Sequence, residues 1–133
     1  MSEANKSLVR RYYAEAMGDL SGIGHVATDG FVDHHMPQGL PPGPEGVRRF
    51  FKDILGSIFS DIKIEVDFMI AEGNEVDCHF VVSCKHIGEF AGIKPKGNTI
   101  SLPAISTFRV EGCKLAEACE IYDSGSMVQQ MRA

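Results

Sequence analysis

The feature that most constrains the fold is a change of hydrophobic period at about residue 59. Before it, apolar side chains follow Pro44 at spacings of three and four, as on one face of a helix. After it, apolar and charged residues alternate, as in a strand with one buried face. The helical set is Val47, Phe50, Phe51, Ile54, Leu55 and Ile58, and the first alternating set is Ile62, Ile64, Val66, Phe68 and Ile70. The pattern predicts a helix that leads directly into a long strand.

The same two periods divide the rest of the chain. Helical spacing over residues 3–17 and a shorter helical stretch over 20–28 precede a short strand at 31–36. Alternating segments then cover residues 77–86, 99–110 and 114–122, and a short helix covers 125–131. Helices followed by a run of long strands indicate one α+β domain over residues 1–133. Strands this long must curve to be covered by one layer of helices, so we expect a curved antiparallel sheet around an apolar pocket.

The balance of charges excludes one class of partner. Lys and Arg number 13 and Asp and Glu 18, which gives a net charge of −5, whereas a nucleic-acid-binding face would be basic. No stretch approaches the length of a membrane span, and the first residues lack the apolar run of a secretory signal, so we expect a cytoplasmic protein. The four cysteines form no CxxC pair and are expected to be free thiols.

Asp123 is the first candidate for chemistry. Alternation along the last strand puts it on the same face as Leu115, Cys119 and Ile121, so its carboxyl would point toward an apolar interior. Desolvation there would favour the neutral acid and allow proton exchange near neutral pH. Because Asp123 also precedes a short helix, it equally suits an N-cap, which would keep it ionised. The sequence leaves both interpretations open.

Three histidines are further candidates. His34 and His35 are neighbours on a strand and therefore point to opposite sides, so at most one faces the core. Adjacent strand residues do not easily chelate one ion and no third ligand has a telling spacing, so we expect a hydrogen-bonded pocket histidine and no metal. His86 shares a face with Cys84 and is either a core residue or a proton partner of Asp123.

Aromatic side chains mark the expected wall of the pocket. Tyr12 and Tyr13 lie on the apolar stripe of the first helix, where a hydroxyl either reaches a ligand oxygen or stays at the rim. Phe51 on the long helix, with Phe80 and Cys119 on the strands, completes the predicted ligand-binding set.

Four stretches carry a resemblance to a known family. They are VRRYYAEAMGDL, FVDHHMPQGLPPGPEGVRRFF, KHIGEFAGIKPKGNTI and FRVEGCKLAEACEIYDSGSMVQQM, and the third looks like an H-x-G-x-F-x-G-x-x-P-x-G signature. With these, nearly the whole chain resembles the SnoaL-like polyketide cyclases of the NTF2-like superfamily. The resemblance implies a cone-shaped α+β barrel, a curved antiparallel sheet covered by N-terminal helices and usually dimeric through the sheet. It also implies ring closure by an intramolecular aldol step that needs no cofactor.

The resemblance assigns roles to three residues. The acid–base Asp of the family falls on Asp123, the His of its hairpin signature on His86, and the His of its first strand on His34. Members often carry His-Trp where this chain has Ala118-Cys119, a departure that reshapes the expected pocket.

Two functions are the main expectations. The first is acid–base chemistry on a small apolar carbonyl compound, either aldol-type ring closure or a related lyase or isomerase step. Asp123 would move the proton, and His34, His86 or a tyrosine would stabilise the oxyanion. The second is a module that binds such a molecule without chemistry. A ketosteroid isomerase-like or epoxide hydrolase-like enzyme, or a dimeric interaction domain with a filled pocket, is a further alternative.

Overall fold

The computed structural model describes residues 2–133, and its helices and strands follow the predicted order. In chain order the elements are α1 (Ser2–Met17), the 3₁₀ turn η1 (Ile23–His25), β1 (Ala27–Asp33), α2 (Pro44–Arg49), the π-helical η2 (Phe50–Leu55), α3 (Gly56–Ile58), β2 (Phe59–Glu72), β3 (Glu75–His86), β4 (Thr99–Glu111), β5 (Lys114–Tyr122) and α4 (Ser124–Arg132). The α+β class is confirmed. Within the described part of the chain, no helix is long and apolar enough to cross a membrane.

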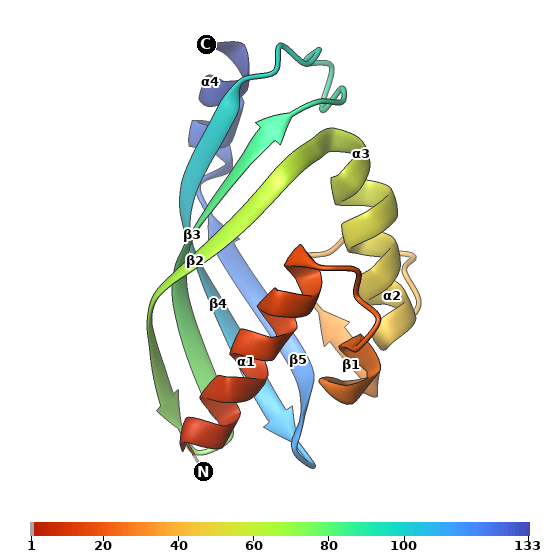
Figure 1. Ribbon diagram of the computed structural model, residues 1–133, viewed down its shortest axis with the longest axis vertical. Helices are drawn as coiled ribbons and strands as arrows, with labels where there is room; N and C mark the ends of the chain where they lie inside the picture. The colour runs from red at the N-terminus through yellow and green to blue at the C-terminus, as the bar shows by residue number, and fades with distance from the viewer. Residues whose placement is uncertain (1) are drawn as a thin grey trace.

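The strands form one curved sheet in the order β1-β5-β4-β3-β2. The last four strands are joined in antiparallel pairs, and β1 runs parallel to β5 at the edge (Figure 1). The predicted curved antiparallel sheet is confirmed for β2 to β5, and β1 is added to its edge in parallel. Since β1 is far from β5 in the sequence, no hairpin turn dictates that the two strands run in opposite directions.

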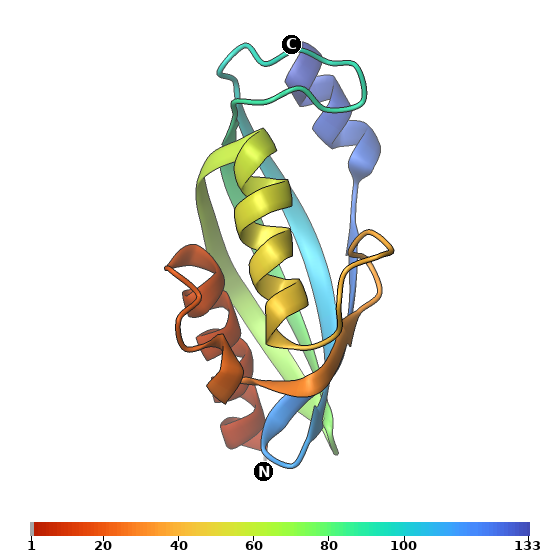
Figure 2. The same cartoon turned by 90° about the vertical axis from the view of Figure 1, so that its right-hand side faces the viewer.

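The helices cover the concave face of the sheet. The apolar stripe of α1 lies against the sheet and buries Val9, Tyr12 and Tyr13 next to Phe108 of β4. The segments α2, η2 and α3 follow one another without a break and cross the mouth of the cone in front of the sheet (Figure 2). A π turn is one residue wider than an α turn, and it brings Phe50, Phe51 and Leu55 to the inner side.

Two of the β-bulges in the sheet account for the differences from the predicted faces. In β2, Val66 pairs with the inward Phe80, but the next pair is Phe68 with His79, so Asp67 is the extra residue. In β5, Leu115 pairs with Val110 and Glu117 with Arg109, so Ala116 is the extra residue. One inserted residue moves every later side chain to the opposite face.

The bulges correct two predicted faces. Phe68 and Ile70, predicted to share the inner face with Ile62 and Ile64, are 50% and 57% exposed. On β5 the predicted inner set was Leu115, Glu117, Cys119 and Ile121, but beyond the bulge Ala118, Glu120 and Tyr122 face inward instead. The error has a single cause, because the alternation was continued through a residue that has no partner on the neighbouring strand.

Candidate active site

A cavity of about 140 Å³ lies between the inner face of the sheet and the covering helices. It is similar in size to an apolar cavity that accepts a single benzene ring. Most of its lining is apolar, and seven of the lining side chains are Phe or Tyr, namely Tyr12, Tyr13, Phe50, Phe51, Phe59, Phe80 and Tyr122. Tyr122 is 39% exposed, so the cavity reaches solvent on that side.

The polar part of the lining is a cation held between two carboxylates. Nδ1 of His35 lies 2.5 Å from Oδ1 of Asp33, and Nε2 of the same ring lies 2.7 Å from Oε2 of Glu120. The side chains of Asp33, His35 and Glu120 are 4%, 20% and 17% exposed, respectively. Two carboxylates and one imidazolium leave one net negative charge on the cavity wall.

Local sequence explains how Asp33 and His35 come to share a face. Phe31 is buried, and alternation from Phe31 places Asp33 on the same side at the end of β1. The chain then turns, and Oδ1 of Asp33 accepts a hydrogen bond from the backbone N–H of His35 at 3.2 Å. This Asx-type turn keeps the His35 ring beside the carboxylate.

Hydrogen bonds extend the polar chain across the cavity to α1. The hydroxyl of Tyr13 donates to Oγ of Ser106 at 2.7 Å, and the Ser106 hydroxyl lies 3.4 Å from Oε1 of Glu120. Ser106 and Glu120 are direct cross-strand partners on β4 and β5. Hydrogen bonds and ion pairs therefore connect Tyr13, Ser106, Glu120, His35 and Asp33 in one chain, in which each interaction polarises the next.

The two carboxylates hold His35 in its charged form. Burial disfavours the imidazolium, but hydrogen bonds and charge attraction from Asp33 and Glu120 outweigh it and raise the pKa of His35 to about 10. His35 is therefore a cation at neutral pH. The edge of its ring also packs against Phe50, with ring centroids 5.5 Å apart.

Tyr12 contributes a hydroxyl without a partner. The side chain lines the cavity and is 2% exposed, and its oxygen has no hydrogen-bond partner among the described residues. Burial raises the pKa of Tyr12 well above its usual value, and the charges of Asp33 and Glu120 raise it further. The hydroxyl stays protonated and is an unused hydrogen-bond donor of a residue that lines the cavity.

Asp123 does not lie at this cavity. Its side chain is exposed, and Oδ1 accepts a hydrogen bond from the backbone N–H of Ser126 at 3.0 Å, which makes it the N-cap of α4. The prediction that the carboxyl faces the interior is wrong, because the bulge at Ala116 has changed the phase of β5 before the chain reaches it. The N-cap interpretation is confirmed.

The predicted histidines take separate places. His34 is on the outer side, with a side chain 52% exposed and Nε2 2.5 Å from Oε2 of Glu117, so the pocket histidine is His35 and not His34. His86 is completely buried beside Phe59, as its core interpretation predicts, but outside the cavity lining. Neither ring nitrogen of His86 has a partner in residues 2–133, so the expected pair with Asp123 is absent.

The predicted ligand-binding set divides in the same way. Tyr12, Tyr13, Phe51 and Phe80 all line the cavity. Cys119 is exposed and pairs with Thr107 on the outer face, so its predicted position is wrong for the same reason as that of Asp123. Of the polar chain, Asp33, Ser106 and Glu120 were missed, and His34 was predicted as a catalytic residue where the structure places His35. Ser106 carries a readable signal, since it falls in phase between the inward Ala104 and Phe108.

No metal site accompanies this arrangement. From residue 2 onward, no group of three or more His, Cys, Asp or Glu side chains is arranged to hold a metal ion.

A mixed α+β cone with a partly polar cavity is the architecture of the NTF2-like class. The chain shares it with a protein of ketosteroid isomerase-like fold from Catenulispora acidiphila, at 15% identity over 94% of this chain and 92% of that one, with a TM-score of 0.75. The family model for SnoaL-like polyketide cyclases matches residues 7–131, so the chain belongs to that family.

Other solved structures share the fold of this chain. TsrD from Streptomyces laurentii superposes with a TM-score of 0.83 at 19% identity, covering 97% of this chain and 95% of that one. A SnoaL-like polyketide cyclase from Agrobacterium tumefaciens gives 0.79 at 13% identity, covering 95% and 96%. No curated protein matches the chain by sequence.

Proposed function

We propose that the protein is a cofactor-free acid–base enzyme that closes a ring in a small carbonyl compound by an aldol-type step. One observation carries this proposal: a hydrogen-bonded chain of Asp33, His35 and Glu120 lines an otherwise apolar cavity. Charged groups fixed in such surroundings act on a reacting molecule more strongly than they would in water. The family membership supports the class of reaction.

Glu120 is the proposed base. It is the more exposed of the two carboxylates, and it lines the cavity beside Ser106. A proton on the carbon next to the substrate carbonyl passes to Glu120, and the electron pair of that C–H bond moves onto the carbonyl oxygen as an enolate. The His35 imidazolium, 2.7 Å from Glu120, provides positive charge close to the new anion.

Tyr12 is the proposed donor to the enolate oxygen, because its hydroxyl is protonated and unpartnered. One well-placed donor of this kind contributes about 3 kcal/mol to the transition state. The enolate carbon then attacks a second carbonyl carbon of the same molecule. The proton on Glu120 returns to the alkoxide that this bond formation leaves, so the enzyme ends in its starting state.

The base is tested by proton exchange. We would incubate 2-tetralone, a small ketone with acidic α-protons, with the protein in D₂O and follow loss of the α-proton signal by NMR. Glu120→Gln should slow catalysed exchange by about 100-fold or more, and Tyr12→Phe by about tenfold or more. Asp123→Asn is the matched control, since Asn keeps the N-cap and the residue lies outside the cavity. Exchange that survives Glu120→Gln, or that is lost in Asp123→Asn, would contradict the assignment.

A binding module without chemistry is the second candidate. It is favoured by the observation that Asp33, His35, Glu120, Ser106 and Tyr13 already satisfy one another. In this case 2-tetralone would shift the NMR signals of the cavity residues, and the protein would not accelerate exchange.

The outer face of the sheet supports a proposal about assembly. Phe68, His79, Ile105 and Ile121 are successive cross-strand partners on four strands, and they form an apolar row on that face. Phe68 stacks on His79 with centroids 4.1 Å apart, and Ile105 and Ile121 are 40% and 75% exposed. We propose that two copies dimerise through this row. Sedimentation should show a dimer that Ile121→Lys converts to a monomer, and a wild-type monomer would contradict the proposal.

A further inference from the structure

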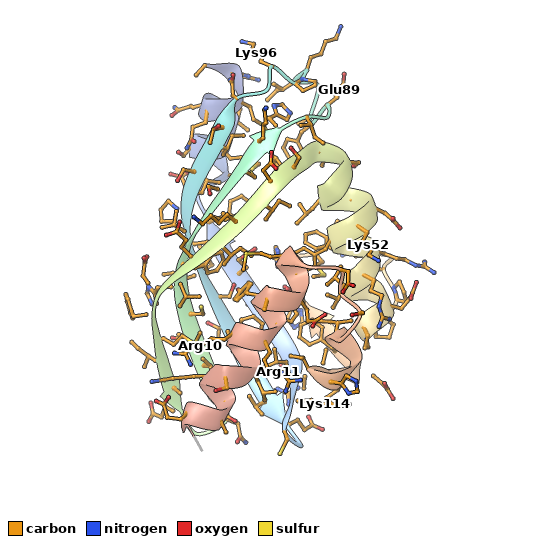
Figure 3. All side chains as sticks on the ribbon, in the orientation of Figure 1. Arg10, Arg11, Lys52, Glu89, Lys96 and Lys114 are labelled. Atoms are coloured by element: carbon orange, nitrogen blue, oxygen red, sulfur yellow. The ribbon has the colours of Figure 1, made fainter. Side chains whose placement is uncertain are left out.

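The charge of the cavity indicates what kind of ligand it holds. Asp33 and Glu120 carry two negative charges and His35 one positive charge, all on one side of the cavity. None of the described residues that line the cavity is Lys or Arg. The labelled Lys52 and Lys96 are exposed residues outside the lining, and Nζ of Lys96 donates to the carbonyl oxygen of Arg132 (Figure 3). The net negative charge is therefore not neutralised from within.

The apolar part of the lining is suited to a positive charge. The rings of Tyr12, Tyr13, Phe50 and Phe51 lie close to the polar chain, with Tyr12 and Phe51 centroids 6.2 Å apart and Phe50 and Phe51 centroids 5.2 Å apart. The face of an aromatic ring attracts a cation, most strongly where water is excluded. An anionic ligand would find His35 as the one cationic side chain among the described lining residues, and this imidazolium is already paired with Asp33 and Glu120.

The unpartnered hydroxyl of Tyr12 is an independent sign of a polar ligand. It is buried in the cavity wall, and the Asp33 and Glu120 charges act on it. A buried hydroxyl without a partner is costly unless a bound group satisfies it. A carbonyl oxygen would accept the hydrogen bond of this hydroxyl. The net negative charge of the site would then attract a second, positively charged group of the same ligand.

We infer that the ligand of this cavity is an amino-substituted carbonyl compound whose ammonium group is positively charged at neutral pH. The inference rests on the proposed function in placing the carbonyl group at Tyr12 and Glu120. It goes beyond that function in giving the substrate a charge. When a proton moves from the substrate carbon to Glu120, the total charge of site and substrate stays the same. The ammonium group would therefore stabilise the bound substrate and the bound enolate to a similar extent.

The test compares two molecules of the same shape and different charge. Phenyltrimethylammonium is a permanent cation, and tert-butylbenzene is its neutral isostere. Binding of each would be measured at pH 6.5, where His35 stays charged, by following the NMR signals of cavity residues. We expect the cation to bind at least about tenfold more tightly than the isostere, a difference of about 1.4 kcal/mol. Equal or tighter binding of tert-butylbenzene, or no binding of the cation at about 1 mM, would overturn the inference.

Variants locate the origin of the preference. Glu120→Gln and Asp33→Asn each remove the net charge, so each should lower the cation-to-isostere ratio by about tenfold. Glu117→Gln is the matched control, because it removes the same charge from the outer face of the same strand. A ratio that stays unchanged in both cavity variants contradicts the inference. The two proposals fail separately. If the protein exchanges the protons of 2-tetralone but does not prefer the cation, only the inference about the ligand is wrong. If it prefers the cation but does not catalyse exchange, only the proposed enzyme activity is wrong.

Discussion

Replacing His35 tests the central feature of the site, the cation between two buried carboxylates. His35→Gln keeps a polar side chain of similar size but removes the charge, which leaves Asp33 and Glu120 facing each other. The pKa of His35 rises from 6.5 to about 10 on folding, and a difference of this size corresponds to about 5 kcal/mol. Removing the cation from a buried pair of carboxylates should therefore destabilise the fold strongly.

The pH dependence distinguishes this cause from simple loss of packing. Because the folded-state pKa is above the unfolded-state value, the folded protein binds the proton more tightly. The contribution of the His35 charge to the free energy of unfolding is complete below about pH 6.5 and is lost as the pH rises toward about 10. The difference in unfolding free energy between wild type and His35→Gln should fall by about 2.5 kcal/mol between pH 7 and pH 9.

Urea unfolding followed by far-UV circular dichroism measures this difference, since the chain has no Trp to report by fluorescence. His34→Gln is the control, because His34 pairs with Glu117 at the surface and such exposed pairs contribute less than about 1 kcal/mol. If the difference in unfolding free energy between wild type and His35→Gln stays constant from pH 7 to pH 9, His35 is not a cation stabilised by Asp33 and Glu120.

Two further substitutions test the surroundings of the site by the same urea measurement. Tyr13→Phe should lower the unfolding free energy by about 1–2 kcal/mol, because the buried Ser106 hydroxyl loses its 2.7 Å partner, and a change below about 0.3 kcal/mol would contradict that role. Gly46→Ala should cost about 2 kcal/mol or more, since a Cβ there would lie 2.0 Å from the carbonyl oxygen of Pro41. Gly24→Ala meets nothing within 4 Å and should stay within about 0.5 kcal/mol of wild type, so equal costs at the two glycines would contradict the packing argument.

The sequence predicts the elements well because each has a clear hydrophobic period. The helix at the N-terminus, the helix that leads into β2 and the four long strands all lie where the spacing of apolar residues places them. Tyr12, Tyr13 and Phe80 line the cavity and lie in stretches of uninterrupted period, and Phe51 lines it from the π-helical segment η2. Ser106 was within reach by the same reasoning, as a polar residue in phase with an apolar face.

The charged residues of the site were harder to predict. His34 and His35 lie in the turn after β1 and not on the predicted strand at 31–36, so this turn and not alternation places His35 in the cavity, and the family resemblance favoured its neighbour His34. Glu120 could not be predicted, because a bulge leaves no mark in the pattern of a strand whose outer side is also partly apolar. The same bulge turned Asp123, which looked like an inward carboxylate, into a surface helix cap.

The bulge at Ala116 has a consequence for how sites change within this family. Deleting one residue between the bulge and Glu120, such as Ala118, would exchange Glu120 and Tyr122 for Cys119 and Ile121 on the cavity wall. Deleting Ala116 itself would instead restore simple alternation and leave Glu120 in the cavity. A single-codon insertion or deletion is thus enough to replace the reactive groups while the helices and strand order stay the same. A sequence alignment along β5 matches equivalent residues only when both chains carry the bulge. The pairing register between β4 and β5 is therefore a better guide than the alignment to which carboxylate lies in the cavity.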